Sequence, residues 1–190
     1  MSCTPKTSVT SPDGSIKLQF GNAGRFSRES PSSSSAVSLP TDGNYSIRDV
    51  VGADEYAQHV DDNAFTNGFA KLALRATVKA AGILGESVPD NWMLFAEGLV
   101  IPEKDDITLD YAGYDGQLTK QADPNLLAYP LGLITDPERI LRDLEYYAPR
   151  IDSKDGQAMT RCIFAVQYAG LGDADKAYEF FRRSFEPNLH

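Results

Sequence analysis

Acidic side chains gather in one nine-residue segment, which raises the question of acid–base chemistry. The segment holds Asp54, Glu55, Asp61 and Asp62, and Asn63 follows it. Acidic and amide side chains commonly cap the free backbone amides at the start of a helix, and capping is the simpler explanation of the last three residues. A catalytic role for these three is the alternative that the spacing leaves open.

Glu55 is harder to explain as a cap, because it lies eight residues before Asn63. It belongs to the loop sequence Gly-Ala-Asp-Glu-Tyr, which ends at Tyr56. A carboxyl group beside an aromatic ring in a partly dry loop can hold its proton and donate it as a general acid. Glu55 is therefore the candidate catalytic residue.

A cation, an amide and a carboxylate follow one another near the end of a second segment, residues 114–123. Lys120 and Gln121 supply hydrogen-bond donors suited to sugar hydroxyl groups. Asp123 could accept hydroxyl protons, but its spacing favours capping of the helix that follows. Lys120 and Gln121 are therefore the candidate substrate-binding residues.

Other kinds of site find no support in the sequence. His59 and His190 are isolated, so no Ser/His/Asp group can be assembled, and no Gly-rich phosphate loop is present. Cys3 and Cys162 show neither a CxxC pattern nor the Cys/His spacing of a zinc site, and a disulfide framework is not expected. We therefore expect neither a metal nor a cofactor.

The overall charge narrows the range of partners. Lys and Arg total 18 and Asp and Glu total 27 in 190 residues, which gives a net charge of −9. We expect no nucleic-acid partner and no membrane partner, because an acidic chain is repelled by polyanions. No apolar run reaches the roughly 18 residues that span a bilayer. The first residues lack the apolar core of a signal peptide, which favours the cytoplasm. The sequence does not otherwise determine the localisation.

Two regions differ in composition. Eleven of the first 40 residues are serine, and such a segment buries too little apolar surface to offset its ordering entropy. We predict that residues 1–43 are mostly disordered, with one candidate strand at 16–20. Residues 44–190 form the second region, in which apolar residues recur with helical spacing.

The helical patterns are separated by loops, and the longest loop covers residues 102–116. No convincing strand pair is found after Asn44. Successive amphipathic helices predict an all-α fold of antiparallel helical hairpins, and the lack of a fixed repeat favours a helical barrel over a solenoid. The predicted helices span residues 69–84, 89–98, 122–129, 135–148, 157–169 and 174–185.

Apolar stripes predict which helix faces are covered. Within residues 135–148 we expect Ile140, Leu141, Leu144 and Tyr147 to point inward. Met159, Cys162, Ile163 and Val166 share one face of the helix predicted at residues 157–169. Two other stripes, within residues 69–84 and 174–185, are wide enough to need cover on the inner side. The second of these consists of Ala174, Ala177, Tyr178, Phe181 and Phe185.

The two polar segments resemble those of glycoside hydrolase family 65. That family holds acid trehalases, phosphorylases of maltose, kojibiose and trehalose, and a glucosidase acting on glucosylgalactosyl-hydroxylysine. Residues 52–67 resemble the family's general-acid motif, and residues 119–123 resemble its lysine-glutamine sugar-contact motif. The resemblance extends from residue 43 to residue 190. It fits the hydrolase branch better than the phosphorylases at residues 129–131, 146–148 and 158–160.

The resemblance implies a partial (α/α)6 barrel, of which this chain holds a later portion of the catalytic domain. It implies that Glu55 is the general acid and that Lys120 and Gln121 bind the glucosyl unit in the same cavity. The substrate would be a trehalose-like glucosyl disaccharide or a glucosyl conjugate. The family inverts the anomeric centre, which requires a second carboxylate about 6.5–9.5 Å from the acid.

The resemblance places that base, or the phosphate loop of a phosphorylase, beyond the end of this chain. We therefore expect a fragment that carries the acid without the base. A disaccharide phosphorylase and a non-catalytic helical remnant are the alternative functions. A partial barrel leaves apolar helix faces uncovered, so self-association of the isolated chain is a further expectation.

Overall fold

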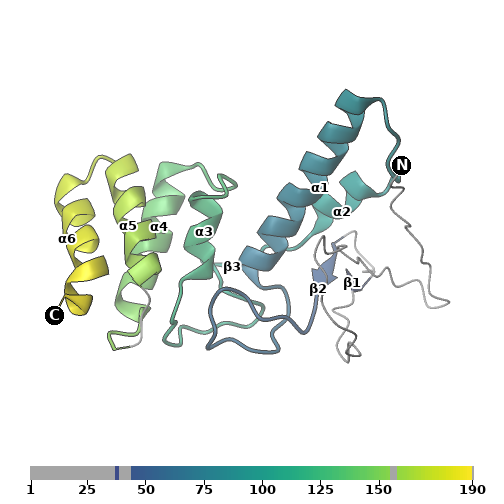
Figure 1. The fold of residues 1–190 in the computed structure, drawn as a ribbon. Helices are drawn as coiled ribbons and strands as arrows, with labels where there is room; N and C mark the ends of the chain where they lie inside the picture. Colours follow the sequence, from purple (N-terminus) through teal and green to yellow (C-terminus); the bar gives the residue numbers. More distant parts are fainter. Residues whose placement is uncertain (1–36, 39–43, 155–157, 190) are drawn as a thin grey trace, which may run out of the picture.

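The computed structural model describes residues 37–38, 44–154 and 158–189, and the described part is mainly helical (Figure 1). Its helices are α1 (Ala64–Leu84), α2 (Trp92–Gly98), α3 (Asp123–Ala128), α4 (Pro137–Tyr147), α5 (Ala158–Gly170) and α6 (Ala174–Phe185). Two short 3-10 helices follow α4 and α6 at Ala148–Arg150 and Glu186–Asn188. The strands are β1 (Val37–Ser38), β2 (Ser46–Ile47), β3 (Glu103–Lys104) and β4 (Ile107–Thr108).

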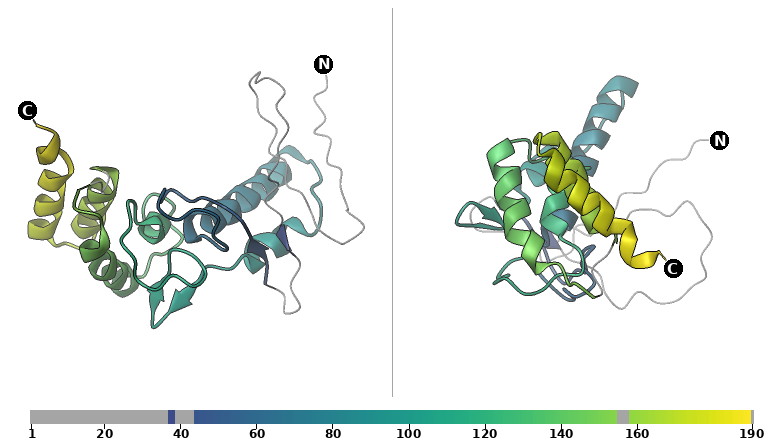
Figure 2. Two further views of the ribbon diagram at one scale, coloured as in Figure 1. Left: turned by 90° about the horizontal axis from the view of Figure 1, so that it is seen from below. Right: turned by 90° about the vertical axis from the view of Figure 1, so that its left-hand side faces the viewer.

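The helices are arranged as a row with the loops at one end. Helices α3, α4, α5 and α6 stand side by side in Figure 1, and α1 and α2 lie beyond α3. The left-hand view of Figure 2 shows the same separation of α1 from the α4–α6 end. The loops before α1, before α3 and between α4 and α5 gather below the row. This arrangement, an open portion of an (α/α)6 barrel, confirms the predicted fold class and brings the two polar segments to one end of the helices.

Local sequence signals explain where several helices begin and end. The Asn63 side chain accepts a hydrogen bond from the Thr66 amide and starts α1, five residues earlier than the apolar pattern predicts. Asp173 accepts from the Lys176 amide in the same way. Gly85 ends α1 with a φ of 70°, the left-handed conformation that favours glycine. The capping role predicted for Asn63 is thus confirmed, and Asp173 and Gly85 mark the start of α6 and the end of α1.

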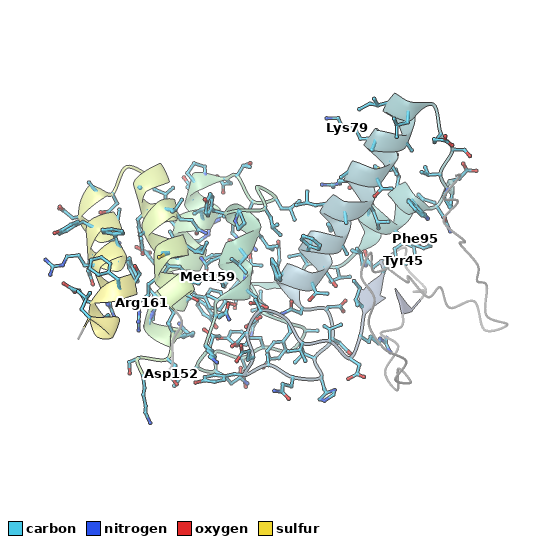
Figure 3. All side chains as sticks on the ribbon, viewed as in Figure 1. Tyr45, Lys79, Phe95, Asp152, Met159 and Arg161 are labelled. Carbon is cyan, nitrogen blue, oxygen red and sulfur yellow. The ribbon has the colours of Figure 1, made fainter. Side chains whose placement is uncertain are left out.

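Three apolar clusters hold the described region together, and two of them join helices. The larger cluster joins α4, α5 and α6 through Leu144, Tyr147, Phe164 and Phe180, all of which are buried. A smaller cluster packs α2 against the chain before α1, where the Tyr45 and Phe95 rings meet edge to face at 4.7 Å (Figure 3). Large aromatic surfaces in such contacts supply most of the burial that stabilises helix pairs.

Helices α1 and α3 approach each other closely at Gly68. A Cβ atom at this position would lie 2.4 Å from Leu127 Cδ2, so only glycine fits the crossing. Leu127 is itself 1% exposed and has no room to move aside.

The expected absence of a strand pair after Asn44 is wrong, because β3 and β4 form an antiparallel hairpin. Asp105 and Asp106 connect the strands with φ values of 51° and 61°. Two successive residues of positive φ are the signature of a tight hairpin turn, and Asp tolerates this conformation better than most side chains. The turn was missed because it lacks the glycine that usually marks it.

The expected inward position of Leu141 is also wrong, since this side chain is exposed. The stripe on α5 forms one face, as predicted, but Met159 and Val166 are exposed there. The stripe on α6 is also open to solvent, with Tyr178 61% and Phe181 53% exposed. These apolar faces therefore lack cover within the described residues.

The Ser-rich first region is described only at β1, which pairs with β2. The candidate strand at 16–20 and the predicted disorder fall outside the described residues, and the division at residue 43 stays a prediction. No helix in the described ranges combines the length and apolar character needed to cross a membrane.

Candidate functional site

Glu55 and Lys120 are in direct contact, although 65 residues separate them. Lys120 Nζ donates to Glu55 Oε2 at 2.5 Å. The Glu55 side chain is 60% exposed, whereas that of Lys120 is 20% exposed. The candidate acid is thus accessible to a ligand and lies beside one of the two candidate sugar-binding residues.

Asp54 links the two loops from below the surface. It is 2% exposed, and its Oδ1 accepts the backbone amides of Lys120 at 2.9 Å and Gln121 at 3.3 Å. The Tyr56 amide also donates to this oxygen. Burial raises the pKa of Asp54 and outweighs the opposing effect of these backbone hydrogen bonds.

Asp123 does not cap its own helix, so the expected role is wrong. It is the first residue of α3, and its Oδ2 accepts from the Ala53 amide and from Asn63 Nδ2, both at 2.9 Å. Burial raises the pKa of Asp123 to about 7, and the nearby Asp54 charge adds to this effect. The carboxylate turns away from α3 because the loop before α1 supplies its donors.

Asp110 completes a group of three buried carboxyls with Asp54 and Asp123. Asn63 Nδ2 lies 3.2 Å from Asp110 Oδ1, in addition to its bond with Asp123. Burial raises the pKa of Asp110 to about 9, with smaller contributions from the charges of Asp123 and Asp54. Burial therefore favours the protonated form of Asp110. Among the described residues, no group of three or more His, Cys, Asp or Glu side chains is placed to hold a metal ion.

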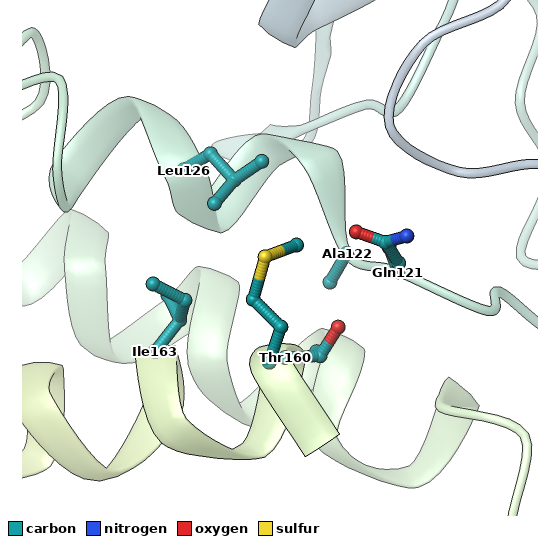
Figure 4. Close-up of a pocket in the computed structure, with 6 residues that line it drawn as sticks. Gln121, Ala122, Leu126, Thr160 and Ile163 are labelled. Carbon is teal, nitrogen blue, oxygen red and sulfur yellow. The ribbon is translucent and has the colours of Figure 1, made fainter. Parts of the chain in front are cut away.

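The Gln121 side chain lies in a shallow depression between α3 and α5 (Figure 4). Ala122, Leu126, Met159, Thr160 and Ile163 line this depression with it, and their side chains leave essentially no room in it for a water molecule. Gln121 Oε1 is buried without a hydrogen-bond partner. The structure thus brings the Gln121 backbone to Asp54, but its side chain enters a hollow whose lining includes neither Glu55 nor Lys120.

A third loop supports the other two. The Thr119 amide donates to the Arg150 carbonyl at 2.8 Å, and the Asp152 amide donates back to the Thr119 carbonyl at 2.9 Å. The Tyr56 hydroxyl donates to the carboxylate of Asp152, which Figure 3 shows below α5. Lys120 and Glu55 are therefore each one residue away from a contact with this loop.

Sequence reasoning found the exposed residues of the site but missed its buried supports. Asp54 was seen only as one acid among four, and Asp110 falls in the predicted loop 102–116 with no pattern to mark it. The one available signal was the short spacing of Asp54 and Asp123 from the candidate functional residues. The arrangement can donate a proton from an exposed carboxyl group and offer an ammonium group to hydroxyl oxygens.

Comparisons with known proteins agree on one family. Residues 33–114 and 101–190 match the model of the glycosyl hydrolase family 65 central catalytic domain. The chain is 46% identical over 149 residues to a kojibiose hydrolase of Flavobacterium johnsoniae, which covers 78% of this chain and 22% of that protein. It is 35% identical over 148 residues to a protein-glucosylgalactosylhydroxylysine glucosidase of Danio rerio, covering 76% and 22%.

An acid trehalase of Candida glabrata is 38% identical over 144 residues, covering 72% of this chain and 12% of that protein. Among solved structures, a candidate kojibiose phosphorylase from the human microbiome matches with a TM-score of 0.67 and 16% identity, covering 82% of this chain and 30% of that chain. This likeness supports the helical-barrel fold. The chain spans about a fifth of the length of the kojibiose hydrolase.

Proposed function

The chain belongs to glycosyl hydrolase family 65, and we propose that it contributes the general acid to hydrolysis of an α-glucosidic bond. The observation that carries the proposal is the contact of Glu55 with Lys120 in an exposed group of loops. Because the chain spans 22% of its kojibiose hydrolase relative, the reaction is proposed for a longer polypeptide of which these residues form one part.

Each residue has a defined task in this proposal. The ammonium group of Lys120 donates to hydroxyl oxygens of the glucosyl unit, and the Gln121 amide is proposed to bind the same unit. Sugar binding draws Lys120 away from Glu55. Glu55 takes up a proton from solvent once Lys120 has left it. It then donates this proton to the glycosidic oxygen, and the bond between that oxygen and the anomeric carbon breaks.

Inversion requires water to attack the anomeric carbon from the opposite face. A second carboxylate takes the proton from that water, at a distance of about 6.5–9.5 Å from the acid in inverting enzymes. We propose that this base lies outside the present chain, which is then a catalytic-domain fragment. The isolated chain is accordingly expected to leave kojibiose and trehalose unchanged.

The substrate proposed is a glucosyl disaccharide or a glucosyl conjugate. Hydrolysis is favoured over phosphorolysis because two kojibiose hydrolases are 46% and 44% identical to this chain. The phosphorylase remains the second candidate, since a candidate kojibiose phosphorylase has the same helical arrangement at 16% identity.

A segment exchange tests the proposal. The 149-residue stretch of the Flavobacterium johnsoniae enzyme that aligns with this chain is replaced by the matching residues of this chain. We expect the hybrid to release glucose from kojibiose without phosphate, and Glu55→Gln to lower the rate by about 10²–10⁴-fold. Glu86→Gln, the same change at an exposed glutamate, is the matched control.

Three other results have distinct meanings. Phosphate-dependent release of glucose 1-phosphate would favour the phosphorylase. A folded hybrid without activity would favour a non-catalytic remnant. Full activity of the Glu55→Gln hybrid on kojibiose would show that another residue is the acid.

A further inference from the structure

We propose that Asp54 and Asp123 are positioning residues, which form a reciprocal clasp between the loop of Glu55 and the loop of Lys120. Each loop supplies one buried carboxylate that accepts backbone amides of the other loop. The inference rests on the proposed function in treating Glu55 and Lys120 as functional. It adds the groups that hold these two residues against each other.

The first half of the clasp runs from the Glu55 loop to the Lys120 loop. Asp54 Oδ1 accepts the amides of Lys120 and Gln121, across 66 and 67 residues of sequence. Asp54 immediately precedes Glu55, so a fixed Asp54 carboxylate also fixes the backbone from which Glu55 projects. Hydrogen bonds to a charged acceptor are stronger and more directional than neutral ones.

The second half runs in the opposite direction. Asp123 lies two residues after Gln121, and its Oδ2 accepts the Ala53 amide at 2.9 Å. Asn63 donates to the same oxygen and so keeps the carboxylate pointed at the loop. Asp54, beside Glu55, and Asp123, close to Lys120, are therefore each hydrogen-bonded to the opposite loop.

Only glycine fits at residue 52, where the backbone lies against Asp123 and Asn63. A Cβ atom at this position would lie 2.1 Å from Asp123 Oδ2 and 2.4 Å from Asn63 Nδ2. Asp123 and Asn63 are both fully buried, so neither can yield to an added methyl group. The absence of a side chain at residue 52 lets the Glu55 loop approach closely enough for the Ala53 amide to reach Asp123.

A purely stabilising role explains the arrangement poorly. Burial raises the pKa of both Asp54 and Asp123, which means that their charged forms are disfavoured where they lie. Burying carboxyl groups costs free energy that apolar residues would not cost. What these carboxyls supply in return is a fixed distance between two exposed side chains.

Amine labelling of the full 190-residue chain tests the clasp without requiring catalysis. Acetylation of each lysine is followed by mass spectrometry, and Lys79, exposed far along α1 (Figure 3), is the internal reference. We expect Asp54→Ala to raise the labelling rate of Lys120 relative to Lys79 by about tenfold, the effect of losing its backbone anchors. Asp54→Asn retains a carbonyl acceptor and should restore most of the protection.

Two further variants make the test specific. Gly52→Ala should raise Lys120 labelling by displacing Asp123, although residue 52 contacts neither Lys120 nor Glu55 in the described interactions. Asp115→Asn changes an exposed acid of the same loop and should have no effect. Glu55→Ala removes the acceptor that contacts Lys120 Nζ and sets the upper limit of the labelling rate.

The outcomes separate this proposal from the proposed function. Equal increases at Lys79 and Lys120 would mean that Asp54 supports the fold as a whole, and unchanged Lys120 labelling in both Asp54→Ala and Gly52→Ala would exclude the clasp. Neither labelling result would bear on whether the hybrid enzyme hydrolyses kojibiose, which is the test of the proposed function. Conversely, an inactive hybrid would count against the proposed function but would not change the labelling pattern expected for the clasp.

Discussion

Thr108 binds the buried Asp143 carboxylate with both its backbone and its side chain. The Thr108 amide donates to Asp143 Oδ1 at 2.9 Å, and the Thr108 hydroxyl donates to Oδ2 at 2.7 Å. Arg139 donates to the same hydroxyl oxygen and pairs with Glu103. This network fixes the β3–β4 hairpin to α4.

Thr108→Val should therefore destabilise the chain. The change preserves the shape of the side chain but leaves the buried Asp143 oxygen and Arg139 without their shared hydroxyl. The loss of a buried hydrogen bond of this kind costs about 1–3 kcal/mol. Urea unfolding followed by circular dichroism measures the difference. Thr77→Val, an exposed threonine on α1, is the control, and equal effects of the two changes would contradict the role of the network.

Asp110→Asn should stabilise the chain increasingly as the pH rises. The pKa of Asp110 is raised from 3.8 to about 9 in the folded state, so the folded chain retains a proton that the unfolded chain releases. Stability from this group is therefore complete below about pH 4, falls as the pH rises toward 9, and is level above that value. Asn cannot ionise, and its carbonyl can still accept from Asn63.

The measurement is the difference in unfolding free energy between Asp110→Asn and the unchanged chain from pH 5 to pH 9. Comparing differences removes the contributions of other titrating groups. A difference that stays constant with pH would show that Asp110 is ionised in both states. Asp136→Asn, at the exposed start of α4, serves as the control.

Glu55→Gln should lose less activity on substrates with good leaving groups. An aryl glucoside releases a stable phenolate that needs little protonation, whereas kojibiose releases a poor leaving group. The rate ratio between the two substrates should therefore widen by at least about tenfold in the Glu55→Gln hybrid, as expected when only leaving-group protonation is lost. An equal loss on both substrates would point to a role in binding.

The exposed face of α6 should promote self-association. Tyr178, Phe181 and Phe185 are exposed there, and contiguous apolar surface of this kind favours contact between copies. We expect Phe181→Ser to shift the sedimentation distribution toward the monomer. Glu179→Ser, an exposed residue of the same helix, should not. A chain that is monomeric at high concentration before any change would refute the expectation.

The sequence predicted the helices well because helical spacing and capping are local properties. Asn63, Asp173 and Gly85 each act on residues within the next or previous turn, and each could be identified from its neighbours. The β3–β4 hairpin escaped because its strands have two residues each and its turn uses Asp105 and Asp106. Its stability comes instead from Asp143, which lies 35 residues after Thr108.

The site was predictable only at its surface. Glu55 and Lys120 were found through their motifs, and the structure places them in contact. The role of Asp123 was misjudged because capping is decided by local spacing, whereas its actual donors lie 60 and 70 residues earlier. An open apolar face on α6 was expected for a partial barrel, but the exposure of Met159 and Val166 on α5 could not be inferred, since an apolar stripe looks the same whether or not a neighbour covers it.

The contact of Gly68 with Leu127 sets the angle at which α1 crosses α3. Any side chain at this point would tilt the helix away from α3, and the start of the helix would swing with it. Asn63 lies at the start of α1, five residues before Gly68, and its side-chain amide bridges Asp110 and Asp123. A methyl group added at residue 68 would thus change the spacing between the loops that carry Glu55 and Lys120, although no residue in either loop would be changed.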